Sequence, residues 1–131
     1  DLPAGLPALA YAHKAQRRAA AVGFDFGDAG PALDKLREEV GELVADPGAG
    51  ELGDVLFACV AVARQLGADP ELALRGAALR FRSRVERAAA LAAEAGERFE
   101  DLAPGDQLAW YARAKTSPEV AAEGQAPDAR R

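Results

Sequence analysis

Residues 51–66 form an apolar stretch that breaker sequences close at both ends. The sequence Asp-Pro-Gly-Ala-Gly at 46–50 precedes it and Gly67 follows it, and residues of these kinds interrupt regular structure. Its apolar residues recur on nearly every side of a helix: Leu52, Val55, Leu56, Phe57, Cys59, Val60, Val62 and Leu66. Such a helix is normally buried on several sides. The stretch therefore predicts the centre of a helical domain. Its apolar surface exceeds what four neighbouring helices can cover, so we also expect a homodimer.

Proline and glycine positions predict four further helices, at about residues 6–22, 30–45, 70–95 and 106–115. The chain has 33 alanines, 15 leucines and no isoleucine, a composition that favours helices over strands. Short loops between consecutive helices favour antiparallel packing. We predict an all-α fold, an antiparallel bundle of about five helices that dimerisation completes. We expect one domain at residues 1–116 and a disordered tail at 117–131.

Charge and composition exclude several classes of protein. The net charge of −5 argues against stable nucleic-acid binding, which needs a basic surface. The single Cys59 excludes a disulfide framework and a cysteine-based zinc site. No apolar run is long enough to cross a membrane and no signal peptide opens the chain, so we expect a cytoplasmic protein. Because the first residue is Asp1 rather than Met, we expect a fragment or a processed product.

Acidic residues gather on the two predicted helices that flank the 46–50 breaker. Glu38, Glu39 and Glu42 share one side of the first of these helices, and Glu51 and Asp54 lie three residues apart on the second. In an antiparallel hairpin the two sets come level with each other. Such a group of carboxylates suits a hard divalent cation such as Mg²⁺, which prefers oxygen ligands. We therefore predict a metal site here.

The alternative for the three glutamates is a plain solvated face. On a helical wheel they lie opposite an apolar stripe, so taken alone they fit that alternative better. The stripe consists of Leu33, Leu36, Val40, Leu43 and Val44. Asp54 changes the balance, because it lies on the most apolar helix of the chain, where a carboxylate needs a partner.

Arginines gather on the predicted helix 70–95. Arg80, Arg84 and Arg87 recur at helical spacing beside an apolar stripe. A solvated basic face is the plain interpretation of such a row, but guanidinium groups also match phosphate oxygens. Together with a carboxylate-held metal, the row indicates a nucleotide polyphosphate as ligand.

At this point the chain resembles a known family, the MazG-type nucleoside triphosphate pyrophosphohydrolases. The pattern EExxE…ExxD at residues 38–42 and 51–54 carries the resemblance. The order of further segments is similar to the catalytic C-terminal half of two-domain MazG proteins, at residues 6–9, 14–17, 22–26, 53–58, 63–67, 69–71 and 80–84. The resemblance implies obligate dimers and Mg²⁺-dependent hydrolysis of a nucleoside triphosphate to monophosphate and pyrophosphate, as nucleotide-pool house-cleaning.

The resemblance also implies roles for individual residues. Mg²⁺, or Mn²⁺ in its place, would be bound by Glu39, Glu42, Glu51 and Asp54. Glu38 would act with Glu39 in catalysis by orienting or deprotonating the attacking water. Contacts to the phosphates and the nucleotide would come from Lys35, Arg80, Arg84, Lys115 and an aromatic side chain at Trp110 or Tyr111.

Two departures from the family pattern leave other functions open. Only eight residues separate Glu42 from Glu51, fewer than in the family, and Ala78 stands where the family has an asparagine. Both features favour a non-catalytic helical dimer that keeps the fold as an interaction module. A third interpretation is a relative that hydrolyses another nucleotide phosphoanhydride, such as dUTP or phosphoribosyl-ATP.

Overall fold

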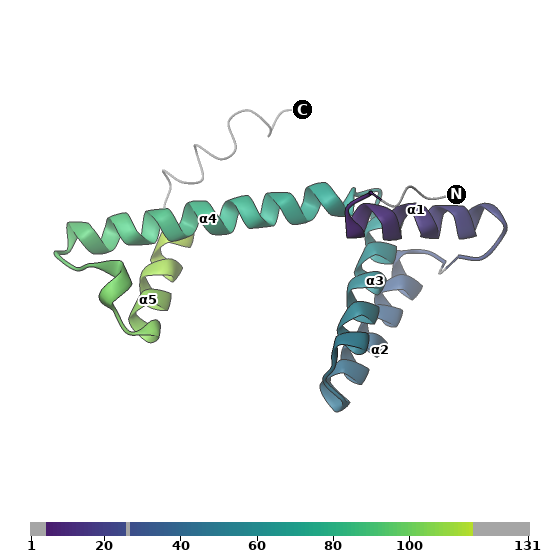
Figure 1. Cartoon of the computed structure of the whole chain (residues 1–131), viewed down its shortest axis with the longest axis horizontal. Helices are drawn as coiled ribbons and strands as arrows, with labels where there is room; N and C mark the ends of the chain where they lie inside the picture. Colours follow the sequence, from purple (N-terminus) through teal and green to yellow (C-terminus); the bar gives the residue numbers. More distant parts are fainter. Residues whose placement is uncertain (1–4, 26, 117–131) are drawn as a thin grey trace. The chain divides into compact units, whose positions relative to one another are not determined.

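The computed structural model describes residues 5–25 and 27–116. Within these residues the chain is all-α, with five helices and no strand, which confirms the all-α part of the predicted fold (Figure 1). The helices are α1 (Ala8–Ala21), α2 (Ala29–Ala45), α3 (Ala49–Leu66), α4 (Pro70–Glu94) and α5 (Pro104–Lys115), and the 3₁₀ turn η1 (Phe99–Asp101) precedes α5. The predicted tail at 117–131 lies outside the described residues.

Local sequence signals explain where α3 ends and α4 begins, close to the predicted positions. Gly67 ends α3 with a φ of 72°, a left-handed conformation that glycine adopts without strain. Asp69 caps α4, since its Oδ1 accepts hydrogen bonds from the backbone N–H groups of Glu71 at 2.9 Å and Leu72 at 3.2 Å. The turn η1 was not predicted.

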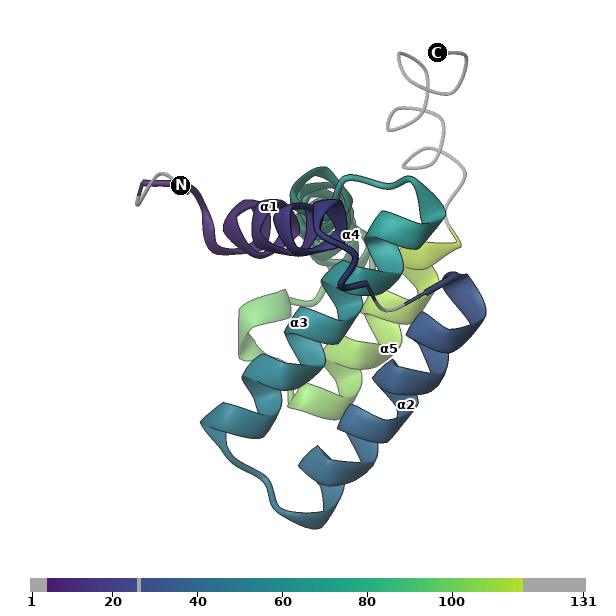
Figure 2. The same ribbon diagram turned by 90° about the vertical axis from the view of Figure 1, so that its right-hand side faces the viewer.

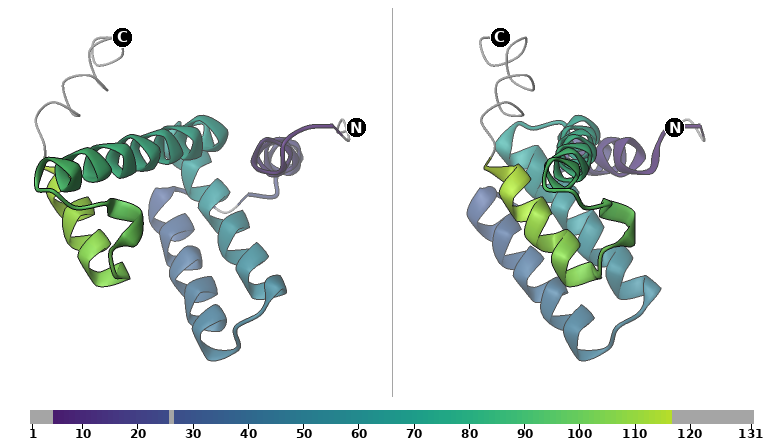
Figure 3. Two further views of the ribbon diagram at one scale, coloured as in Figure 1. Left: turned by 60° about the vertical axis from the view of Figure 1, so that its left-hand side comes forward. Right: turned by 90° about the vertical axis from the view of Figure 1, so that its left-hand side faces the viewer.

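The chain forms two compact units that divide between Leu74 and Arg75, within α4. In the first unit α2 and α3 form an antiparallel hairpin, and α1 packs against α3 (Figures 2 and 3). The hairpin confirms that the 46–50 breaker folds α3 back along α2. It brings the two acid-bearing helices side by side.

Small side chains form the core of the first unit. Ala58, Val60 and Ala61 are buried on α3 and Ala32 is buried on α2. Alanine at these positions allows the helix backbones to approach closely.

The larger apolar residues of α3 lie outside this core. They are 41% to 65% exposed: Leu52, Leu56, Phe57 and Leu66. In the single chain α3 is therefore not buried on several sides. Cys59, one of the apolar residues of this stretch, is also exposed.

Two polar contacts tie further segments to α3. Gln16 of α1 is buried, and its Nε2 donates a hydrogen bond of 3.0 Å to the backbone oxygen of Phe57. Arg64 donates hydrogen bonds of 3.0 and 3.4 Å to the two carboxylate oxygens of Asp25, in the loop after α1. These contacts hold α1 and its loop against the hairpin.

The second unit contains the rest of α4, η1 and α5. The rings of Phe81 and Tyr111 meet with centroids 5.7 Å apart, which joins α4 to α5. Gln107 donates a hydrogen bond of 2.7 Å to the backbone oxygen of Phe99 and so ties α5 to η1. No helix in the described part of the chain has both the length and the apolar character that a membrane span requires.

Candidate functional site

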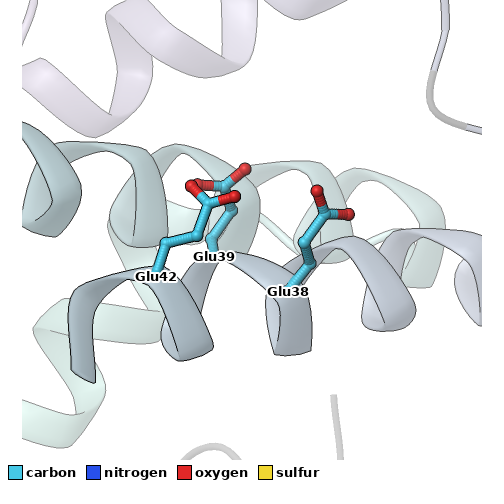
Figure 4. Close-up of side chains that lie close together, drawn as sticks. All are labelled: Glu38, Glu39 and Glu42. Atoms are coloured by element: carbon cyan, nitrogen blue, oxygen red, sulfur yellow. The ribbon is translucent and has the colours of Figure 1, made fainter. Parts of the chain in front are cut away.

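Three glutamates of α2 bring their carboxylate oxygens together. Glu38, Glu39 and Glu42 each offer an oxygen atom within 4.8 Å of the others (Figure 4). Positions i, i+1 and i+4 of a helix lie near one another on its surface, and all three side chains rise from the same side of α2. The structure thus brings together the EExxE part of the predicted site.

Glu39 differs from its two neighbours because it is buried, with 8% of its surface exposed. It lies two helical turns from Ala32, the other buried residue of α2, and α2 packs on α3. By contrast, Val40 is 41% and Val44 is 75% exposed. The expectation that the acids lie opposite a buried apolar stripe is therefore wrong for Glu39. The small Ala32, rather than the large valines, marks the packed side of α2.

Lys35 neutralises part of this cluster. Its Nζ lies 3.0 Å from Oε2 of Glu39 and 3.7 Å from Oε2 of Glu38. The hydrogen bond to Glu39 and the charges of both glutamates raise the pKa of Lys35 above its ordinary value. The family resemblance implied that Lys35 contacts the substrate. In this structure Lys35 is instead a counter-ion of Glu38 and Glu39.

The two acids of α3 lie on the adjacent helix but not within this cluster. Neither Glu51 nor Asp54 belongs to the group of oxygens within 4.8 Å of one another. Oε1 of Glu51 lies 3.3 Å from the point where a Cβ on Gly48 would stand, so this side chain turns back toward the start of α3. Asp54 is exposed. The sequence predicts that Asp54 needs a partner, because it lies on an apolar helix. Since water solvates the exposed carboxylate, that need does not arise.

The chemistry of the α2 cluster fits a hard divalent cation. It offers carboxylate oxygens alone, one of them on a buried side chain and two on exposed ones. Mg²⁺ prefers such oxygen ligands and keeps several water molecules. One lysine cannot balance three carboxylates, so the cluster keeps a net negative charge that a divalent cation would offset.

The other predicted residues belong to the second unit. Arg84 is half-buried and Arg80 exposed, and among the described residues neither forms an ion pair, whereas Arg82 pairs with Glu86 at 3.3 Å. Lys115, at the end of α5, is exposed.

Trp110 is already engaged within the same unit. Its Nε1 donates a hydrogen bond of 3.1 Å to Glu97, and the guanidinium carbon of Arg113 lies 4.5 Å from the ring centroid. Its neighbour Tyr111 contacts Phe81. The structure therefore holds both candidate aromatic side chains in fixed contacts.

A second polar region was not singled out from the sequence. A hollow of about 450 Å³ lies where α1 meets the end of α3. It is lined by His13, Arg17, Arg64, Gly67, Ala68 and Asp69. None of the clustered glutamates lines it, and two of its polar groups already have roles, Arg64 in binding Asp25 and Asp69 in capping α4.

Comparison with known proteins gives relatives of one kind. No family model matches the chain. The chain is 39% identical over 105 residues to the nucleoside triphosphate pyrophosphohydrolase of Escherichia coli K12, covering 73% of this chain and 40% of that protein. It is 38% identical over 110 residues to the nucleoside triphosphate pyrophosphohydrolase/pyrophosphatase MazG of Thermotoga maritima, covering 81% of this chain and 43% of that protein. The chain thus spans about two fifths of the length of these curated relatives.

Proposed function

We propose that this chain, which is homologous to one segment of the MazG nucleoside triphosphate pyrophosphohydrolases, hydrolyses nucleoside triphosphates to monophosphate and pyrophosphate with Mg²⁺. The observation that carries the proposal is the carboxylate cluster of α2, with Glu39 buried between two exposed glutamates. A buried carboxylate is unfavourable unless a cation or hydrogen bonds offset its charge. The role in the cell would be the clearance of unwanted nucleotides.

In this proposal the metal ligands come from both helices of the hairpin. Glu39 and Glu42 would bind the ion from α2, and Glu51 and Asp54 would bind it from α3. The exposed Asp54 and the half-buried Glu51 lie on the helix that packs against α2. Both side chains have to turn toward the α2 cluster for this ligand set to form. Mn²⁺ has the same ligand preferences and would substitute for Mg²⁺.

The reaction needs an activated water molecule and a stabilised leaving group. A bound Mg²⁺ offsets negative charge on the triphosphate and lowers the pKa of bound water. Glu38, which is exposed beside Glu39, would orient the attacking water and accept its proton. The water oxygen forms a bond to phosphorus, and the bond between the α and β phosphates breaks to release pyrophosphate.

Cationic side chains of the second unit would contact the substrate. Arg80 and Arg84 are the best candidates, because neither is committed to an ion pair among the residues described and guanidinium groups bind phosphate oxygens well. Lys35 would contact the phosphates from α2, and Lys115 and Trp110 would contact the nucleoside.

We also propose that the protein is a homodimer. Several large apolar side chains exposed on one helix are typical of a protein interface. The exposed side chains of α3, namely Leu52, Leu56, Phe57 and Leu66, supply such a surface. A second copy of the chain would cover it.

A panel of canonical and damaged nucleoside triphosphates, assayed with Mg²⁺ and with EDTA, tests the proposal. The nucleoside monophosphate should be quantified together with pyrophosphate, because a contaminating pyrophosphatase removes only the latter. Glu39→Gln should abolish the reaction, and Asp34→Asn should not, since Asp34 lies on the same helix but pairs with Arg37 at 2.7 Å. A chain that dimerises yet yields no product from any nucleotide would favour the non-catalytic dimer.

A further inference from the structure

Lys35 already holds one carboxylate oxygen of the buried glutamate that a divalent cation would use as a ligand. Its ammonium group lies 3.0 Å from Oε2 of Glu39, the buried member of the cluster, and 3.7 Å from Oε2 of Glu38. The spacing i, i+3 and i, i+4 on one helix explains both contacts. In the described part of the chain no other cation pairs with Glu39.

This pair differs from an ordinary surface ion pair. Arg82 and Glu86 have the same i, i+4 spacing, but their side chains are 76% and 68% exposed, so water screens both charges. The Glu39 side chain is 11% exposed, so its charge is poorly solvated. Removing the cation beside such a group leaves an uncompensated charge.

We infer that Lys35 is the resident counter-ion of the carboxylate cluster, and that a divalent cation binds Oε2 of Glu39 by displacing the Lys35 ammonium group. The inference rests on the proposed function, since it assumes that the cluster binds metal. Mg²⁺ at its usual distance of about 2.1 Å from the oxygen that holds the ammonium at 3.0 Å would lie close to this second positive charge, and the repulsion between them favours exchange of one cation for the other.

Displacement has a consequence for the substrate. The lysine side chain is a flexible four-carbon stem, and in this structure it is 41% exposed, so it can turn from the cluster toward solvent. Once freed, its ammonium lies beside the metal site, where a triphosphate brings negative charge. Lys35 would then contact substrate only after the metal has bound, which couples the two binding events.

Metal binding to the nucleotide-free chain tests the inference. Mn²⁺ affinity should be measured by calorimetry and by electron paramagnetic resonance for wild type, Lys35→Met and Arg37→Met. Arg37→Met is the matched control, because it removes one positive charge from the same helix but the charge is paired with Asp34 rather than with the cluster. We expect Lys35→Met to bind Mn²⁺ at least about fivefold more tightly than wild type, and Arg37→Met to bind within about twofold of wild type.

The outcomes separate this inference from the proposed function. Equal Mn²⁺ affinity of Lys35→Met and wild type, with binding retained in both, overturns the counter-ion role and leaves the metal site standing. Absence of Mn²⁺ binding in every variant overturns both. Lys35→Arg keeps the positive charge, so it provides a second test in case Lys35→Met does not fold. It should bind Mn²⁺ no more tightly than wild type, and tighter binding by Lys35→Arg would contradict displacement.

Discussion

Arg64, near the end of α3, holds the carboxylate of Asp25 through hydrogen bonds of 3.0 and 3.4 Å, although 39 residues separate the two in sequence. Gln65 adds a weaker contact of 3.5 Å to the same carboxylate. The Arg64 side chain is only 10% exposed, whereas Asp25 is 37% exposed. The pair fixes the loop between α1 and α2 to the hairpin that carries the acidic cluster.

Loss of the Asp25 carboxylate should destabilise the fold. We expect Asp25→Ala to lower the free energy of unfolding by about 1–2 kcal/mol, because it leaves a largely buried guanidinium without its acceptor. Urea denaturation measures the change. Asp34→Ala is the control, since its pair with Arg37 is about three quarters exposed on both sides, and we expect it to stay within about 0.5 kcal/mol of wild type.

A second stability prediction concerns the hydrogen bond between Gln16 and the backbone of Phe57. Nε2 of Gln16 donates to the Phe57 backbone oxygen at 3.0 Å, while Oε1 is buried without a partner. Gln16→Met removes the hydrogen bond and the unpaired oxygen together, so we expect a change of less than about 1 kcal/mol in unfolding free energy. Gln16→Glu introduces a buried charge and should cost about 2–4 kcal/mol at neutral pH. Equal stability of the two variants would show that the site is open to water.

The helices were predictable from the sequence because their signals are local. Asp69 followed by Pro70, and Gly67 after Leu66, mark helix ends through backbone chemistry that neighbouring residues alone determine. The acidic cluster was predictable for the same reason, since i, i+1 and i+4 positions meet on any helix.

The packed faces of α2 and α3 were less predictable because small residues define them. A hydrophobic pattern gives most weight to large side chains, so Val40 and Val44 looked buried and Glu39 looked exposed. In the structure the buried residues of the two helices are Ala32 and Glu39 on α2 and Ala58, Val60 and Ala61 on α3. In a chain so rich in alanine, the face that carries alanine cannot be distinguished from the others by periodicity alone. Whether the carboxylates of Glu51 and Asp54 reach across the hairpin to the α2 glutamates depends on their side-chain rotamers. The spacing of residues in the sequence does not determine these rotamers.

Substrate binding should depend on two arginines of α4 that are free of ion pairs within the described structure. We expect Arg80→Ala and Arg84→Ala each to raise KM about 5- to 50-fold, the effect of losing a charge-assisted hydrogen bond, with the melting temperature unchanged. Arg82→Ala, on the same helix but paired with Glu86, serves as the control and should leave KM unaffected. If Arg80→Ala or Arg84→Ala melts far below wild type while KM stays unchanged, that arginine stabilises the fold and does not bind substrate.

Dimerisation should depend on the exposed apolar residues of α3. We expect sedimentation at micromolar concentration to give a species of twice the 13.6 kDa chain mass. Leu56→Lys should shift the protein toward monomer, because it places a charge on a residue that is 48% exposed in the single chain. Val22→Lys is the control, since Val22 is 84% exposed at the end of α1. A wild-type sample that sediments as monomer throughout would contradict the proposed dimer.

Asp54 and Glu51 are the proposed ligands from α3, and substitution of Asp54 gives the sharpest test of the proposed metal site. Asp54 is exposed and lies outside the α2 cluster, so Asp54→Ala should leave the melting temperature of the metal-free protein within about 2 °C of wild type. Mg²⁺ should raise the melting temperature of wild type, because a ligand bound only to the native state stabilises it. If α3 supplies a ligand, Asp54→Ala loses most of this increase together with pyrophosphate release. If the α2 glutamates alone hold the ion, the variant keeps both the increase and the activity, and the site reduces to Glu38, Glu39 and Glu42. Thermal melts of both proteins across a Mg²⁺ titration, paired with product assays on the same samples, decide between a site shared by the two helices and a site confined to α2.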